Sequence, residues 1–174
     1  DTFHPQVSAI LNITPDHLDR HGSMEEYIRV KELIAKNQTE KDVCVLNYED
    51  EELRRFGELV NARPVYFSSA RRVPGGVYLE GDGIYSELSG EKELVVRTGE
   101  LNILGRHNYE NACAAAAVAW SMGVPMDVIR RAMKEFKAVE HRIEFVTEKD
   151  GVAYYNDSKG TNPDAAIQGI RAMV

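Results

Sequence analysis

The chain has 174 residues, of which 43% are hydrophobic and 28% charged, enough for one well-buried domain with part of a second. The net charge of −7 and the sequence pI of about 5.3 leave no positive field to hold a nucleic acid polymer. A single nucleotide stays possible, because it needs only a local pocket.

The first half of the chain alternates between predicted strands and helices. Residues 7–13 form a near-continuous apolar run, as expected of a parallel strand covered on both faces. Ser23 and Glu26 match a capping box, which opens a helix that we expect to reach about residue 37. The next elements are strands over residues 43–46 and 64–67, separated by a charged helix over 50–61. This alternation predicts an α/β fold, a mostly parallel sheet with flanking helices and right-handed crossovers.

A small antiparallel insert is expected over about residues 74–104. Two short strand-like pieces surround a Gly-Asp-Gly turn within residues 76–88, and a third piece covers 93–97. Helical patterns then return over residues 108–122 and 127–136.

The pattern breaks near residues 137–140, where we place a domain boundary. Beyond it, residues 143–155 have the pattern of a hairpin, and Pro163 suits the first position of a further helix. We therefore expect one domain over residues 1–140 and the beginning of another over 141–174.

Cys44 and Cys113 indicate the cellular compartment. They lie far apart within apolar segments without a CxxC spacing, so we expect free buried thiols and a cytoplasmic location. The longest apolar run, residues 112–120, is too short to cross a bilayer, and no membrane partner is expected. The first residues carry no secretion signal, and the missing initiator Met suggests a fragment or a processed chain.

Lys31 stands out on the second predicted element. On a helical wheel it falls within an apolar stripe that includes Tyr27, Val30 and Ile34. A lysine so placed snorkels outward, pairs with an acid, or loses its proton. A neutral amine can add carbon dioxide, and the resulting carbamate oxygens suit Mg²⁺. The pattern favours snorkelling and leaves carbamylation open.

The segment NITPDHLDRH, residues 12–21, directly follows the first predicted strand. Open α/β sheets bind ligands beyond the carboxyl ends of their strands, so the location suits a site. His17 and His21 are four residues apart, a spacing that could hold zinc. A solvated turn capped by Thr14 would tolerate the same charges, and composition does not decide between the two interpretations.

Two further segments could bind a nucleotide. Asn108 and Asn111 are neighbours on one face of a helix start, and their amides offer the donor and acceptor that the edge of adenine requires. Asn108 would equally serve as an N-cap, which we slightly favour. In the segment YNDSKGTNP, Asp157 could take ribose hydroxyls and Lys159 phosphate oxygens, although such a composition is also typical of a plain loop.

Four motifs in this order resemble the Mur ligase family, whose members join amino acids to a cell-wall precursor using ATP. They are LNITPDHLDRH, the helix containing YIRVK, GRHNYENACAAA, and HRIEF followed by YYNDSKGTNP. The resemblance implies a P-loop-type central ligase domain and the start of a Rossmann-like C-terminal domain. The last motif resembles the branch that adds D-glutamate to UDP-N-acetylmuramoyl-L-alanine in peptidoglycan synthesis.

The resemblance also implies ATP and Mg²⁺ as cofactors, with an acyl phosphate that the D-glutamate amine attacks. It makes His17 and a carbamylated Lys31 the metal ligands. His17, Lys159 and Thr161 become catalytic residues near the transferred phosphate and the incoming amino acid. His21 matches no required ligand, which weakens the zinc hypothesis.

For the nucleotide, the resemblance implies that Asn108 and Asn111 contact adenine. Asp157 would contact the ribose, and Arg142 would bind on the nucleotide side of a domain hinge.

One family feature is missing from these residues. No GxxxxGK[ST] motif occurs, so the P-loop with its lysine and magnesium-binding hydroxyl lies outside the sequence. We therefore expect the latter part of a central domain plus the beginning of a C-terminal domain, inactive in isolation. The alternative is a noncatalytic nucleotide-binding or regulatory module derived from such a ligase. A carbamyl-lysine metal hydrolase would need an HxH pair, which the sequence lacks.

Overall fold

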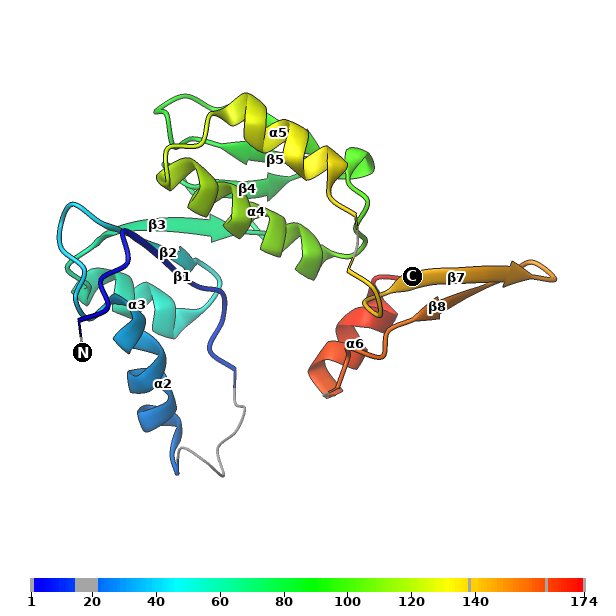
Figure 1. Cartoon of the computed structure of the whole chain (residues 1–174), viewed down its shortest axis with the longest axis horizontal. Coiled ribbons are helices and arrows are strands. Elements are labelled where there is room, and N and C mark those ends of the chain that lie inside the picture. The colour runs from blue at the N-terminus through cyan, green and yellow to red at the C-terminus, as the bar shows by residue number, and fades with distance from the viewer. Residues whose placement is uncertain (1, 15–21, 138, 162, 174) are drawn as a thin grey trace.

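The computed structural model describes residues 2–14, 22–137, 139–161 and 163–173 (Figure 1). Its larger part is built on one six-stranded sheet, whose strands follow one another in chain order. The strands are β1 (Val7–Ile10), β2 (Val43–Asn47), β3 (Arg63–Ser68), β4 (Val77–Glu80), β5 (Gly83–Ser86) and β6 (Glu93–Arg97). Neighbours from β1 to β4 pair in parallel, whereas β5 pairs antiparallel with both β4 and β6. The predicted mostly parallel α/β sheet is confirmed.

The antiparallel strands expected over about residues 74–104 extend the parallel sheet. Phe67 of β3 pairs with Val77 of β4, so the two parts share one hydrogen-bonded ladder. β4 and β5 are joined by a tight turn in which Gly81 has a φ of 60°, a conformation that such turns require and that glycine adopts without strain.

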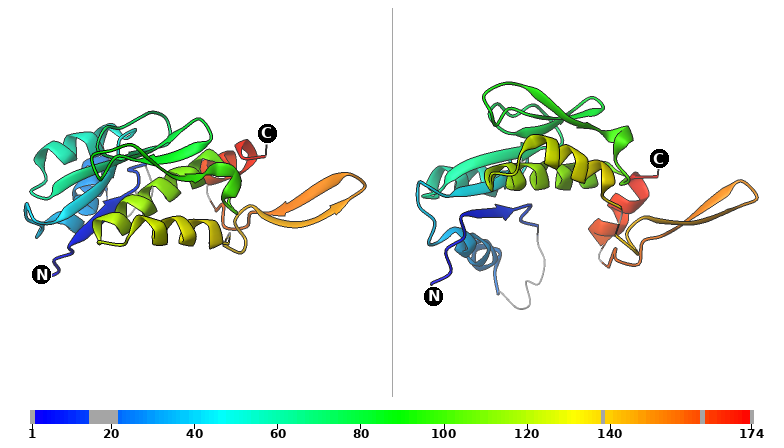
Figure 2. Two further views of the ribbon diagram at one scale, coloured as in Figure 1. Left: turned by 90° about the horizontal axis from the view of Figure 1, so that it is seen from above. Right: turned by 45° about the horizontal axis from the view of Figure 1, so that its top comes forward.

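Helices cover both faces of the sheet (Figures 1 and 2). They are α2 (Met24–Glu32), α3 (Glu51–Leu59), α4 (Arg106–Ser121) and α5 (Met126–Glu135). β2 is buried along its whole length, with Val43 and Val45 in the cluster under α4 and α5, and Cys44 and Leu46 in the cluster under α2 and α3. The two sets alternate because successive side chains of a strand point to opposite faces of the sheet. Cys44 and Cys113 are free and buried, as predicted.

The helix that begins after Ser23 is shorter than predicted. The Ser23 hydroxyl accepts a hydrogen bond from the Glu26 amide at 3.2 Å, so the predicted N-cap is confirmed. α2 ends at Glu32 and passes into a 3₁₀ turn, η1 (Leu33–Ala35), so the expectation of a helix to about residue 37 was wrong. A tightened last turn is a common way to end a helix, because it satisfies carbonyls that have no helical partner.

The residues after 140 form a smaller unit. A hairpin of β7 (Glu144–Lys149) and β8 (Val152–Asn156) turns at Asp150 and Gly151, whose φ angles of 54° and 77° suit a hairpin turn. Figure 1 shows the hairpin projecting at the opposite end of the molecule from β1, with α6 (Pro163–Arg171) at its base. The predicted hairpin and helix are confirmed, whereas the domain boundary stays a prediction. No helix in the described ranges is long and apolar enough to span a membrane.

A buried carboxylate in the antiparallel strands gives the fold a testable pH dependence. Glu87 is 9% exposed and accepts hydrogen bonds from Tyr78 Oη at 2.5 Å and Arg72 Nε at 2.7 Å. The bonds from Arg72 and Tyr78 lower the pKa of Glu87 from 4.5 to about 2. Because the folded-state pKa is depressed, the ionised carboxylate stabilises the fold above pH 4.5, and this stability is lost as the pH falls toward 2.

We predict that Glu87→Gln lowers the thermal midpoint at pH 7 and that the gap to the unchanged protein narrows as the pH falls below about 4.5. Calorimetry across this pH range measures the gap. An equal gap at pH 7 and pH 3 would show that the charge of Glu87 contributes nothing.

Candidate functional site

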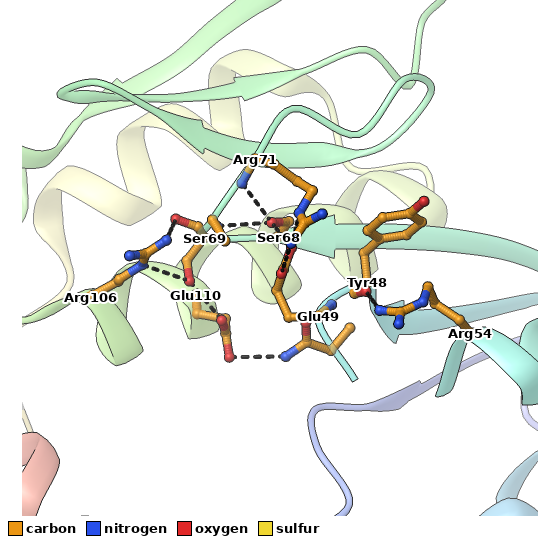
Figure 3. A network of polar contacts seen from close by, with 10 residues as sticks. Tyr48, Glu49, Arg54, Ser68, Ser69, Arg71, Arg106 and Glu110 are labelled. Carbon is orange, nitrogen blue, oxygen red and sulfur yellow. Dashed lines mark hydrogen bonds and ion pairs between the residues drawn. The ribbon is translucent and has the colours of Figure 1, made fainter. Parts of the chain in front are cut away.

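Polar side chains gather where β2 and β3 end, on the side of the sheet that faces the start of α4 (Figure 3). The carboxyl ends of parallel strands lie at one edge of the sheet, which is where open α/β sheets bind ligands. Ser68 Oγ donates to Glu49 Oε1 at 2.8 Å. Arg71 forms a bidentate ion pair with the same carboxylate, from Nε to Oε1 at 3.0 Å and from Nη2 to Oε2 at 2.9 Å. These bonds fix the two chain segments that leave β2 and β3.

Glu110 connects α4 to this edge. Its Oε1 accepts from Asn47 Nδ2 at 3.0 Å, and its Oε2 accepts from Ser69 Oγ at 2.7 Å. Arg106, one turn earlier on α4, donates from its guanidinium to the Ser69 carbonyl at 2.8 Å. Figure 3 shows Arg106 and Glu110 both directed at Ser69. The first turns of α4 are therefore tied to the ends of β2 and β3.

The chain that leaves β1 is held by neighbouring side chains. Asn47 Nδ2 donates to the Leu11 carbonyl at 3.0 Å, and the Ile13 amide donates to Asp50 Oδ2 at 2.7 Å. Asp50 is also the N-cap of α3, accepting through Oδ1. The approach to residues 15–21 is thus anchored on β2 and α3. The predicted ligand His17 and its neighbour His21 lie outside the described residues.

A groove of about 720 Å³ joins three of the predicted nucleotide residues. Asn108, Asn111 and Arg142 line it together with the apolar faces of α4 and α5 and the first residues of the hairpin. The Asn111 side chain is exposed to the groove, and in the part of the chain that the structure describes it makes no hydrogen bond. Alanines at positions 112, 115 and 116 form the adjacent wall.

Asn108 does not cap α4. The helix begins at Arg106 with Gly105 as its N-cap, so the N-cap interpretation of Asn108 was wrong. Asn108 is 9% exposed and donates from Nδ2 to the Leu104 carbonyl at 2.6 Å. Gly105 has a φ of 90°, a conformation that favours glycine and that turns the chain sharply into the helix.

A smaller cavity of about 150 Å³ brings together Arg142, Asp157 and Lys159. Asp157 Oδ1 accepts from the Ile143 amide at 3.1 Å. A Cβ on Gly169 of α6 would lie 2.5 Å from Asp157 Oδ2, so only glycine allows this approach. Thr161 is exposed and lines neither cavity, so the structure brings the other predicted nucleotide-side residues together without it.

The backbone on both sides of Arg142 is strained. His141 has a φ of 67° and Ile143 a φ of 48°, and a β-branched residue in the left-handed region is rare. Such conformations persist where surrounding bonds determine them. Here the His141 amide donates to Glu144 Oε2 at 2.8 Å, and the Ile143 amide is held by Asp157. The position of Arg142 is therefore fixed by its neighbours.

His107 also lines the smaller cavity, and sequence reasoning missed it. Burial, reinforced by the positive charge of Arg142, lowers the pKa of His107, which favours the neutral imidazole. The available signal was its position directly before Asn108. A single histidine at a helix start has no periodicity or spacing that would mark it as functional.

Lys31 is exposed, with its ammonium 5.2 Å from the centre of the Tyr27 ring. The predicted apolar stripe is only partly covered, since Val30 and Ile34 are 36% and 40% exposed. The side chain therefore lies outward on an aromatic face, as the snorkelling interpretation expected. Across the described ranges, no group of three or more His, Cys, Asp or Glu side chains could hold a metal ion.

Comparison with known proteins defines the class. The family model for the Mur ligase middle domain matches residues 1–119. The chain belongs to the Mur ligase family, which confirms the resemblance of its four motifs.

Its relatives and structural neighbours agree with this class. The chain is 57% identical to the UDP-N-acetylmuramoylalanine--D-glutamate ligase of Lachnoclostridium phytofermentans, covering 99% of this chain and 38% of the relative. MurF from Acinetobacter baumannii shares the fold with a TM-score of 0.74 at 20% identity, covering 97% of this chain and 37% of MurF. MurF ligase from Thermotoga maritima in complex with ADP has a TM-score of 0.67 at 21% identity, with coverages of 97% and 39%. The chain thus spans well under half of these proteins.

The contact between α4 and α6 can be tested with two glycines. A Cβ on Gly105 would lie 2.6 Å from Ala172 Cβ, whereas Gly123, with a φ of 82°, has open space around it. Both Gly→Ala changes add left-handed strain, of about 1–2 kcal/mol. We predict that Gly105→Ala destabilises the protein by about 1–3 kcal/mol more than Gly123→Ala, because of overpacking. Denaturant unfolding measures both, and equal losses would contradict a close α4–α6 contact.

Proposed function

We propose that the chain forms the adenine side of the ATP site in a cytoplasmic ligase that adds D-glutamate to UDP-N-acetylmuramoyl-L-alanine. The observation that carries this proposal is the groove that unites Asn108, Asn111 and Arg142, in a chain 57% identical to a ligase of that name. Residues 1–140 would be the latter part of its central domain, and 141–174 the beginning of its C-terminal domain.

The groove suits an adenine ring. The Asn111 amide offers a donor and an acceptor, the pattern that the N6/N7 edge of adenine requires. Asn108 uses its nitrogen on the Leu104 carbonyl, which leaves its oxygen for the exocyclic amine. The alanines of α4 provide a flat apolar wall, and a guanidinium such as that of Arg142 stacks well on a planar ring.

The smaller cavity suits the ribose and the phosphates. Asp157 Oδ1 is engaged by the Ile143 amide, and the remaining lone pairs of the carboxylate can accept from ribose hydroxyls. Lys159 lines the same cavity and offers an ammonium for phosphate oxygens. Thr161 follows two residues later, and we assign it with Lys159 to the phosphate and the incoming amino acid.

ATP would supply the phosphoryl group that converts the substrate carboxylate into an acyl phosphate, which the amine of D-glutamate then attacks. We propose His17 and a carbamylated Lys31 as ligands of Mg²⁺, with His17 beside the reacting groups. The amine of Lys31 is exposed, so carbon dioxide and the metal can reach it. The phosphate-binding loop would come from residues outside this chain.

In the full-length protein that contains these residues, we predict phosphate release from ATP that requires both UDP-N-acetylmuramoyl-L-alanine and D-glutamate. Lys31→Ala should reduce the ligation rate at least about 100-fold, the range seen when an electrostatic contribution to the transition state is lost. Short carboxylates should restore part of it by replacing the carbamate. Coupled phosphate assays at saturating substrate measure both effects.

Lys36→Ala is the matched control, because Lys36 is exposed on the same segment and should retain the normal rate. A full rate in Lys31→Ala would contradict the carbamate role. ATP binding without any D-glutamate-dependent phosphate release would favour a noncatalytic nucleotide-binding module.

A further inference from the structure

We propose that Glu110 is a positioning residue that sets the register of α4, and thereby the placement of Asn108 and Asn111 against adenine. This inference rests on the proposed function, since it concerns the same nucleotide site. Glu110 lies between the two asparagines in the sequence, but its carboxylate is directed at the ends of β2 and β3 (Figure 3).

Asn47 and Ser69, the two partners of Glu110, are buried and form further hydrogen bonds. Asn47 is 4% exposed, and its Nδ2 donates to both Glu110 and the Leu11 carbonyl at 3.0 Å each. Its Oδ1 accepts from the Glu49 amide at 2.9 Å. Ser69 is 6% exposed and receives the guanidinium of Arg106 on its carbonyl. Neither partner can move without breaking other bonds, so Glu110 is attached to a fixed point at the end of β2 and to another directly after β3.

The core face of α4 explains why such an anchor is needed. The buried hydrophobic residues of this helix are all small: Ala112, Cys113, Ala114, Ala116 and Ala117. Small side chains allow a close approach but interdigitate weakly, so they resist sliding and rotation less than large ones do. The two hydrogen bonds of Glu110 at the start of the helix restrict this sliding and rotation, because a hydrogen bond keeps its strength only over small displacements.

The same network connects the nucleotide residues to the segment after β1. From the Leu11 carbonyl, bonds run through Asn47 to Glu110 and on to Ser69 and Arg106. Leu11 leads into residues 12–21, which contain the proposed metal ligand. Glu110 therefore links the start of α4 to the chain that leaves β1 in one hydrogen-bonded frame.

The test is a set of variants in the full-length ligase. Glu110→Ala removes both bonds and should raise the KM for ATP about tenfold, with the KM for D-glutamate within about twofold of normal. Glu110→Gln should keep the KM for ATP within about twofold, because its oxygen can accept from Asn47 and its nitrogen can donate to the Ser69 hydroxyl.

Glu87→Ala is the matched control. Glu87 also accepts two side-chain hydrogen bonds, from Tyr78 and Arg72, but it lies in the antiparallel strands and lines neither cavity. This change should lower the thermal midpoint and leave the KM for ATP unchanged. A role of Glu110 in stability alone would make the two alanine variants behave alike, and that result would overturn the proposal.

A milder variant covers the case in which Glu110→Ala does not fold. Ser69→Ala removes only one of the two bonds and should raise the KM for ATP about threefold. An unchanged KM would overturn the proposal. If the unmodified protein binds ADP but does not ligate, the proposed function fails separately, and the same variants are then compared by their Kd for ADP.

Discussion

The close approach of α4 to the sheet is the constraint on which the rest of the site depends. Alanines and Cys113 on its buried face let the helix lie across the strands, while an adjacent face, which shares Ala112 and Ala116 with the core, lines the groove. The helix therefore presents Asn108 and Asn111 from a rigid support. Because this packing consists of small side chains, the position of the helix depends on the polar contacts at its start. In the sequence, the residues that make these contacts have the pattern of ordinary surface residues.

A second constraint acts at the junction between the sheet and the hairpin. His141 and Ile143 have strained backbone angles and flank Arg142, which lines both cavities. Asp157, directly after β8, stabilises this backbone by accepting a hydrogen bond from the Ile143 amide. Nearby, Gly105 before α4 leaves no room for a side chain against Ala172, and Gly169 of α6 leaves none against Asp157. Asp157, the proposed ribose contact, therefore also helps to position Arg142.

Sequence patterns predicted the features that follow from local periodicity. The buried run of β2, the Ser23 cap and the hairpin at Gly151 all depend on neighbouring residues, and each is present. The end of the helix after Ser23 was predicted less accurately, because α2 ends at Glu32 and not near residue 37. The stripe around Lys31 is partly exposed within the described residues, and the lysine lies outward, as the favoured snorkelling interpretation expected.

Long-range contacts explain what the sequence did not reveal. Glu110 has the pattern of an ordinary charged helix residue, and its partners Asn47 and Ser69 are 63 and 41 residues away. His107 likewise gains its surroundings only when residues 142–169 fold against the start of α4. The four family motifs led to the proposed nucleotide residues, but only the fold shows how these residues are held.

A crystal structure of the full-length protein with ADP would show whether the groove beside α4 holds the adenine. We expect the adenine edge to lie within hydrogen-bonding distance of Asn111 and Asn108, with its ring against the alanines of α4 and the ribose beside Asp157. Adenine bound elsewhere, with both amides left to solvent, would contradict it.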